Sequence, residues 1–299
     1  MKYSLDLDEA LGDDVRRIAA GRLTEAAGLL RKQPDGRDKA IHDARRHVKQ
    51  CRSLYRLVAS GAKDFHKAEN RRLGDIGRRL SALRDATALI EATQFLKREI
   101  SSKSNGMLMD RLAKRLDQRR ESITGQTDAV ADVLASARHD LLEAAKAADD
   151  LSLPHSGRKS ATCLARGWET TGRKAREALE DCASGHEEAF HDLRKRTQDR
   201  WMHAALLNDL WPTALRAIQH QGKALSDMLG HAQDLAILLD AVSGPGELVS
   251  DAVESEAIRE AVLTQQAKLQ DECRDLGAIL FGKSKPRDGR MIVKLLKLR

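Results

Sequence analysis

The chain has 299 residues, of which 32% are charged and only 3% are aromatic, and its formal net charge is +7. This length allows one large helical domain or two domains of about 150 residues, and the composition favours long helices over sheets. No apolar run approaches the ~18 residues of a membrane-spanning helix, and none at the N-terminus has signal-peptide length, so we expect a soluble cytoplasmic protein without a membrane partner.

Apolar residues recur at spacings of three and four between short stretches rich in proline, glycine and serine. The pattern predicts an all-α fold, with four helices on each side of a linker at Pro154. In chain order we expect these helices at residues 7–32, 38–60, 63–101, 107–148, 159–183, 186–210, 213–242 and 247–282. A basic tail, 284–299, follows and could dock as a helix, close over a groove or stay loose.

The two halves of the sequence, about 5–150 and 158–283, align at an offset of 149 residues. His42 then matches His191, and the interval from this histidine to a later aspartate, Asp85 or Asp234, is 43 residues in both halves. A preserved interval across an inter-helix turn predicts a tandem repeat. We therefore expect a single domain over 1–299 that contains two four-helix bundles related by a pseudo-two-fold axis.

The segment IHDARRHVKQCRSLYRL, 41–57, carries a row of cations. On a helix its members fall within an arc of about 80° on one face; they are His42, Arg45, Lys49, Arg52 and Arg56, with Arg46 beside them. Like charges at these spacings cost a few tenths of a kcal/mol per pair. Because no carboxylate interrupts the row, we expect a polyanion to offset the repulsion.

The matching segment FHDLRKRTQDRWMHAAL, 190–206, has a shorter row of polar and basic residues. They are His191, Arg194, Lys195 and Gln198. If the halves face each other, the two rows line a shared basic groove or pore. Arginine offers phosphate oxygens a planar fork of donors, lysine a mobile charge, and a neutral histidine one hydrogen bond. Asp85 and Asp234 are expected to orient these cations and not to take part in catalysis.

These two segments resemble the signature helices of the CHAD family, the conserved histidine α-helical domain. LSALRDATAL and LSDMLGHAQDLAILL are similar to its downstream signatures, and the resemblance covers about residues 5–283. It implies an all-α fold of two pseudo-symmetric bundles around a basic central cavity, and non-catalytic binding of inorganic polyphosphate. The residues that match the family's histidines and basic positions are His42, Arg45, Lys49, Arg52, His191, Arg194 and Lys195.

The sequence also departs from the family pattern. Gln198 replaces the usual lysine, and Thr170 and Thr171 stand where two basic residues are frequent, which predicts fewer phosphate contacts from the second half. No Glu-x-Glu-x-Lys motif of a triphosphate-tunnel hydrolase occurs, so the chain resembles a stand-alone member. Such a member is expected in the cytoplasm, where it would associate with polyphosphate granules.

Two other functions stay open. The same cations and the basic tail could bind nucleic acid, although the chain has few aromatic side chains on which single strands could stack. Two His-Asp dipeptides suggest a metal-dependent phosphohydrolase, but such sites need several ligands from different helices, and adjacent helical residues point about 100° apart. We therefore expect no catalytic residue, no metal and no cofactor. The four cysteines lack metal-ligand or redox spacing, which is typical of reduced, buried thiols.

Overall fold

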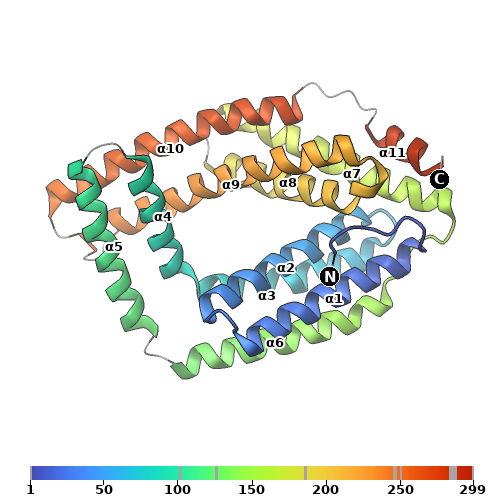
Figure 1. The fold of residues 1–299 in the computed structure, drawn as a ribbon, viewed down its shortest axis with the longest axis horizontal. Coiled ribbons are helices and arrows are strands. Elements are labelled where there is room, and N and C mark those ends of the chain that lie inside the picture. The colour runs from blue at the N-terminus through green and yellow to red at the C-terminus, as the bar shows by residue number, and fades with distance from the viewer. Residues whose placement is uncertain are drawn as a thin grey trace.

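The computed structural model describes residues 2–100, 103–124, 127–184, 187–244, 248–249, 251–282 and 288–297. Throughout these ranges the regular secondary structure is helical, which confirms the predicted all-α class (Figure 1). The α-helices are α1 (Leu11–Lys32), α2 (Arg37–Leu57), α3 (Lys63–Ala82), α4 (Asp85–Glu99), α5 (Lys103–Thr124), α6 (Thr127–Ala147), α7 (Gly157–Asp181), α8 (Glu187–Leu206), α9 (Pro212–Ser243), α10 (Ala252–Phe281) and α11 (Asp288–Lys297). Short 3-10 turns are η1 (Ala148–Asp150), η2 (Cys182–Ser184) and η3 (Asn208–Leu210).

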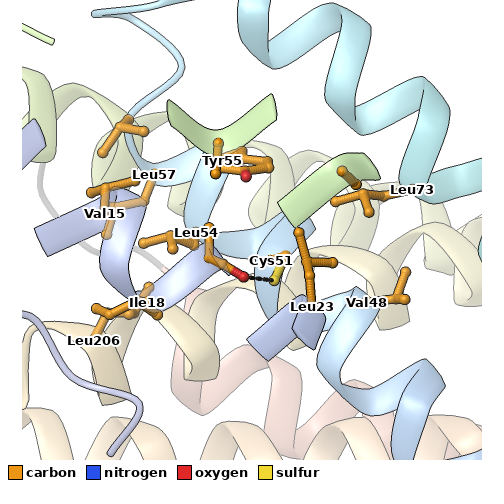
Figure 2. Close-up of a cluster of buried hydrophobic side chains, with 14 of the residues drawn as sticks. Val15, Ile18, Leu23, Val48, Cys51, Leu54, Tyr55, Leu57, Leu73 and Leu206 are labelled. Carbon is orange, nitrogen blue, oxygen red and sulfur yellow. Dashed lines mark hydrogen bonds between the residues drawn. The ribbon is translucent and has the colours of Figure 1, made fainter. Parts of the chain in front are cut away.

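Two groups of four helices form the body of the molecule. Helices α1, α2, α3 and α6 pack on one another in the first half, and α7, α8, α9 and α10 do so in the second. The α2 and α8 helices, which carry the two rows of cations, also pack against each other in the centre (Figure 1). The hydrophobic core beside them contains residues of both halves, including Val15, Ile18 and Leu54 from the first and Leu206 from the second (Figure 2).

The prediction of single helices over 63–101 and 107–148 is wrong. The first is broken at Leu83–Arg84 into α3 and α4, and the second is divided into α5 and α6. After the break, α4 and α5 leave the first group and pack on α9 and α10 of the second (Figure 1). The chain has neither proline nor glycine at 83–84, so tertiary packing decides this break.

The α4 helix is held to α9 by a separate apolar cluster. Ala92 and Leu96 are buried there with Leu235 and Leu238 of α9, and the Phe95 ring stacks on His231, with 4.0 Å between ring centroids. Burying each large aliphatic side chain contributes about 1.5–3 kcal/mol. This contact is only possible because α4 turns away from the direction of α3.

The helix bounds agree with the predicted offset of 149 residues. The ranges of α1 and α2 shift to 160–181 and 186–206, which α7 and α8 cover almost completely. The combined range of α3 and α4 shifts to 212–248, where α9 is one unbroken helix up to Ser243. The agreement concerns helix positions, and the pseudo-two-fold relation stays a prediction.

Within the basic tail, residues 288–297 form the docked helix α11. It packs on α7 and η3 at the end of the molecule opposite α4 and α5 (Figure 1). Ile292 of this helix is buried in the hydrophobic core. Of the three alternatives for this tail, a docked helix, closure over a groove or a loose segment, the docked helix is therefore correct for residues 288–297. None of the helices in the described ranges is both long and apolar enough to cross a membrane. All four cysteines are buried free thiols.

Candidate functional site

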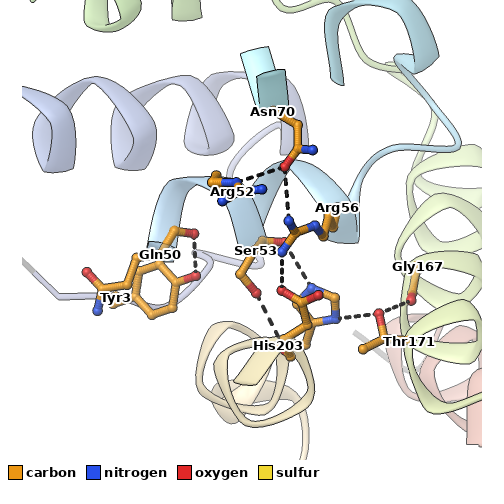
Figure 3. Close-up of polar contacts among 10 residues, drawn as sticks. Tyr3, Gln50, Arg52, Ser53, Arg56, Asn70, Gly167, Thr171 and His203 are labelled. Carbon is orange, nitrogen blue, oxygen red and sulfur yellow. Dashed lines mark hydrogen bonds and ion pairs between the residues drawn. The ribbon is translucent and has the colours of Figure 1, made fainter. Parts of the chain in front are cut away.

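A set of buried polar contacts fixes how α2 lies against α8 (Figure 3). Arg56 donates a hydrogen bond from Nη1 to Oδ1 of Asp199 at 2.7 Å, and His203 donates from Nε2 to the carbonyl oxygen of Ser53 at 2.9 Å. Burial lowers the pKa of His203 to about 4, so the ring is neutral and one nitrogen carries the proton. Because a carbonyl oxygen can only accept, that nitrogen is Nε2. These contacts set the rotation of both helices and hence the direction of their cationic faces.

Cations from the two helices converge beside this seam. Burial, together with the charges of Arg194 on α8 and Arg45 on α2, lowers the pKa of the half-buried Lys49 to about 8. Arg84, which immediately precedes α4, acts in the same direction, whereas Asp234 of α9 opposes it. We call Arg45, Lys49, Arg84 and Arg194 the central cation cluster. It joins the two predicted rows, and it includes one residue that belongs to neither.

Arg194 is held in position by α9. Its Nη1 atom donates a hydrogen bond to Oε1 of Gln233 at 2.6 Å, and Gly230 leaves room for the guanidinium, since a Cβ atom there would lie 3.0 Å from Nη2. Burial lowers the pKa of Arg194, and the charge of Asp234 counteracts that shift. Asp234 thus lies beside a cation of the α8 row, as a supporting carboxylate would. The side chain of Asp85 lies outside the described residues.

The beginning of α2 adds His42 to the same region. Arg84 donates from Nη1 to Nδ1 of His42 at 2.7 Å and from Nη2 to Oε1 of Glu91 at 2.7 Å. Burial and the Arg84 charge lower the pKa of His42, so its ring is neutral near pH 7, with the proton on Nε2. A cavity of about 690 Å³ adjoins this pair. Its lining combines cations with carboxylates and consists of Asp35, Gly36, Arg37, Asp38, Lys39, His42, Arg84, Glu91 and Arg120.

At the C-terminal end of the α2 row, Arg52 and Arg56 are held by side chains of α3 and α8. Oδ1 of Asn70 accepts hydrogen bonds from Nε of Arg52 at 3.0 Å and from Nη2 of Arg56 at 3.1 Å (Figure 3). Arg56 also forms the ion pair with Asp199, whose side chain is 5% exposed. The expectation that no carboxylate offsets the repulsion within the row is therefore wrong for Arg56. Asp199 directly follows Gln198 in the sequence, but only the packing of α8 on α2 reveals its role.

Four of the predicted residues are not among the groups that act most strongly on Lys49. Arg46 is 56% exposed and pairs with Asp43 of its own helix at 3.6 Å, and Lys195 is 49% exposed and pairs with Asp192 at 2.9 Å. His191 and Gln198 are half-buried. Nδ1 of His191 is buried and has no hydrogen-bond partner among the described atoms.

Sequence reasoning missed Arg84, the basic residue that approaches the site from outside α2 and α8. It stands directly before Asp85 in LSALRDATAL, which was the available signal. Within the described ranges, His, Cys, Asp and Glu side chains do not gather into a group of three or more that could hold a metal ion.

A family model described as CHAD domain matches residues 19–243, which is more than half of the chain. The chain belongs to the CHAD family. The crystal structure of the CHAD domain from the plant Ricinus communis is similar to it, with a TM-score of 0.60 and 17% identity over 92% of this chain and 93% of that one. PptA from Streptomyces chartreusis is similar with a TM-score of 0.52 and 14% identity over 97% and 100% of the two chains. At these identities the likeness concerns the fold. No curated protein matches the chain.

The two threonines that depart from the usual CHAD pattern have different structural settings. Thr170 is exposed, whereas Thr171 is buried and donates from Oγ1 to the carbonyl oxygen of Gly167 at 3.0 Å. A long basic side chain at 171 would have to leave this buried position. The second half therefore contributes Arg194 to the central cation cluster without additional charges from α7 at this point.

Proposed function

We propose that this CHAD protein binds inorganic polyphosphate along the α2–α8 seam and does not hydrolyse it. The observation that carries the proposal is the convergence of Lys49 with Arg45, Arg84 and Arg194 from three different parts of the chain. Among the described residues, Asp234 is the carboxylate that counteracts them at Lys49. Membership of the CHAD family supports the same ligand class.

The physical argument concerns the cost of the cluster in the free protein. Placing an amine in a half-buried position among guanidinium groups disfavours its charged form, and the lowered pKa of Lys49 expresses that cost. A chain of phosphates supplies regularly spaced negative charges, which offset the electrostatic cost of placing these cations together. Arginine forks bind phosphate oxygens in pairs, and release of counterions from both partners adds a favourable entropy.

The row on α2 extends this site beyond the cluster. Arg52 and Arg56 are already oriented by Asn70, so little side-chain entropy is lost when they contact a ligand. At the other end, neutral His42 keeps a donor on Nε2. A polyanion that follows α2 would therefore meet a neutral donor first, then the central cation cluster, then the two oriented arginines. This length favours a polymer over a single phosphate.

The test compares two sets of neutral substitutions by calorimetry. The site variant carries Arg45→Gln, Lys49→Met and Arg194→Gln, and the matched control carries Arg46→Gln and Lys195→Gln on the exposed positions of the same helices. We expect the site variant to lose at least about a hundredfold in polyphosphate affinity, and its log–log salt slope to fall by roughly two to three. The control should keep most of its affinity. Equal losses in both proteins would refute the site.

Nucleic acid is the alternative ligand with the same backbone chemistry. Competition of long-chain polyphosphate with duplex DNA at equal phosphate concentration separates the two, and we expect polyphosphate to displace DNA. Displacement in the other direction would overturn the proposal. Phosphate release on incubation with polyphosphate and Mg²⁺ would overturn its non-catalytic part.

The proposal includes a cytoplasmic location at polyphosphate granules. The four free, buried thiols support it, because reduced cysteines are typical of a reducing compartment. A fluorescent fusion should coincide with stained granules, and the site variant above should be dispersed. A granule signal that the site variant retains would mean that another surface directs the protein there.

A further inference from the structure

An arginine of α3 lies beside the α2 row. Measured from the position that a Cβ atom would take on Gly74 of α3, Nη2 of Arg52 and Nη1 of Arg78 are each 3.6 Å away. Two guanidinium groups from different helices therefore lie next to the same point of the α3 backbone. Burial and the Arg56 charge lower the pKa of Arg52, and the Arg78 charge adds to that shift. We call Arg52 and Arg78 the α2–α3 arginine pair.

Several N–H groups of this pair have no partner among the described residues. Arg52 donates from Nε to Oδ1 of Asn70 at 3.0 Å, but its Nη1 and Nη2 atoms donate to no residue in the described ranges and stay accessible to solvent (Figure 3). Arg78 uses Nη2 for Asp75 of its own helix, which leaves Nη1 for a ligand. The side chain of Arg78 is 75% exposed. An anion at this place therefore reaches N–H donors of both arginines.

The carboxylates nearby differ in how firmly they hold their cations. Asp199, the partner of Arg56, has a side chain that is only 5% exposed, whereas the side chain of Asp75 is 51% exposed. Exposed ion pairs contribute little to stability and are screened by salt. A polyanion that has reached Arg52 therefore displaces Asp75 from Arg78 more easily than it displaces Asp199 from Arg56.

We propose that the α2–α3 arginine pair is a phosphate-binding subsite, at which a polyphosphate chain leaves α2 and crosses α3. Arg52 follows Lys49 of the central cation cluster by about 4.5 Å along the helix axis, so a short stretch of one polymer occupies both places. Arginine forks bind phosphate oxygens in pairs. The inference rests on the proposed function and adds to it the course of the polymer and a binding residue, Arg78, that lies in neither predicted row.

The test compares two neutral substitutions on α3 by calorimetry with long-chain polyphosphate. Arg78→Gln removes the proposed contact. Arg79→Gln is the matched control, because Arg79 is directed to α6, where it pairs with Asp140 and donates to Oγ of Ser136 at 2.9 Å. We expect Arg78→Gln to lower the affinity about five- to tenfold and the log–log salt slope by about one, and the control to change neither. Equal losses in both variants, or no loss in Arg78→Gln, overturn the proposal.

Chemical modification maps the same contact in the unsubstituted protein. Phenylglyoxal reacts with accessible arginines, and mass spectrometry of the full chain follows the rate at each one. Long-chain polyphosphate should slow the modification of Arg78 several-fold and leave that of Arg79 unchanged. Polyphosphate binding without protection of Arg78 would overturn this inference and leave the proposed function intact. A chain that shows neither heat of binding nor protection would overturn both.

Discussion

Lys49 should make polyphosphate binding weaken as the pH rises above neutrality. In the free protein its pKa is about 8, because burial, Arg194 and Arg45 disfavour the charged amine. A bound polyanion restores the pKa towards its ordinary value near 10.4. The complex then holds more protons than the free protein between these two values, so affinity is lost as the pH rises through this window.

The size of the effect follows from these two pKa values. Between pH 7 and pH 9 the affinity should fall about tenfold, and at pH 8 about half a proton should be taken up per site. Among the described side chains, Arg45, Arg84, Arg194 and Asp234 are the charged groups that act most strongly on Lys49, and Glu91 pairs with Arg84 at 2.7 Å. The guanidinium groups keep their charge throughout this range. The lysine itself is therefore the group of the cluster that changes state.

Calorimetry at pH 7, 8 and 9, in pairs of buffers with different ionisation enthalpies, measures both the affinity for polyphosphate and the number of protons taken up on binding. Lys49→Arg is the matched variant, since arginine stays charged and should retain its pH 7 affinity at pH 9. The pKa of Lys174, near Arg56 and Asp199, is also lowered, and any contribution from it would persist in that variant. The reasoning is refuted if the wild-type affinity does not change, or if Lys49→Arg weakens by the same factor.

Three further changes test the seam itself. Asp199→Asn should lower the free energy of unfolding, measured with denaturant, by about 1–3 kcal/mol, because Arg56 loses its buried carboxylate. The same variant should bind polyphosphate a few-fold more tightly by calorimetry. Unchanged stability would contradict the ion pair. Gly167→Ala should lower stability by about 3 kcal/mol or more, since its Cβ would lie 1.9 Å from a carbonyl oxygen of α2. In the control Gly28→Ala the new Cβ meets nothing within 4 Å, and this variant should be more stable by about 0.5–1 kcal/mol. Similar shifts of the melting temperature in both variants would argue against the close approach of α7 to α2 at Gly167. Because the folded pKa of His203 is about 4 and the unfolded value about 6.5, stability should fall by about 2 kcal/mol from pH 7 to pH 5; a slope that His203→Gln leaves unchanged would exclude this histidine as its source.

Much of the site was visible in the sequence because the relevant signals are local. The spacing of Arg45, Lys49 and Arg52 places them on one helix face whatever the rest of the chain does. The same holds for Arg194 on its own helix, and the offset of 149 residues predicted that α2 and α8 correspond. The helix bounds agree with that offset, and the family match over residues 19–243 confirms the family that the two segments resembled.

Other parts of the site depend on contacts between residues far apart in the chain. Arg84 reaches His42 only because α3 ends at that point and α4 turns towards α9. Asp199 neutralises Arg56 only because α8 packs on α2 in one rotation. Asp199 does not stand out by its immediate neighbours in the sequence, and the only local signal for Arg84 is its position directly before Asp85.

The sequence by itself determined that the chain is helical, which helix faces are apolar and which carry the cations, because these properties follow from the order of residues along a helix of 3.6 residues per turn. Tertiary structure decided where the long helices break, which half α4 and α5 join, and which cations acquire a carboxylate. Each of these outcomes depends on the difference in free energy between alternative packings of segments that are distant in the chain, and a short stretch of sequence does not determine that difference.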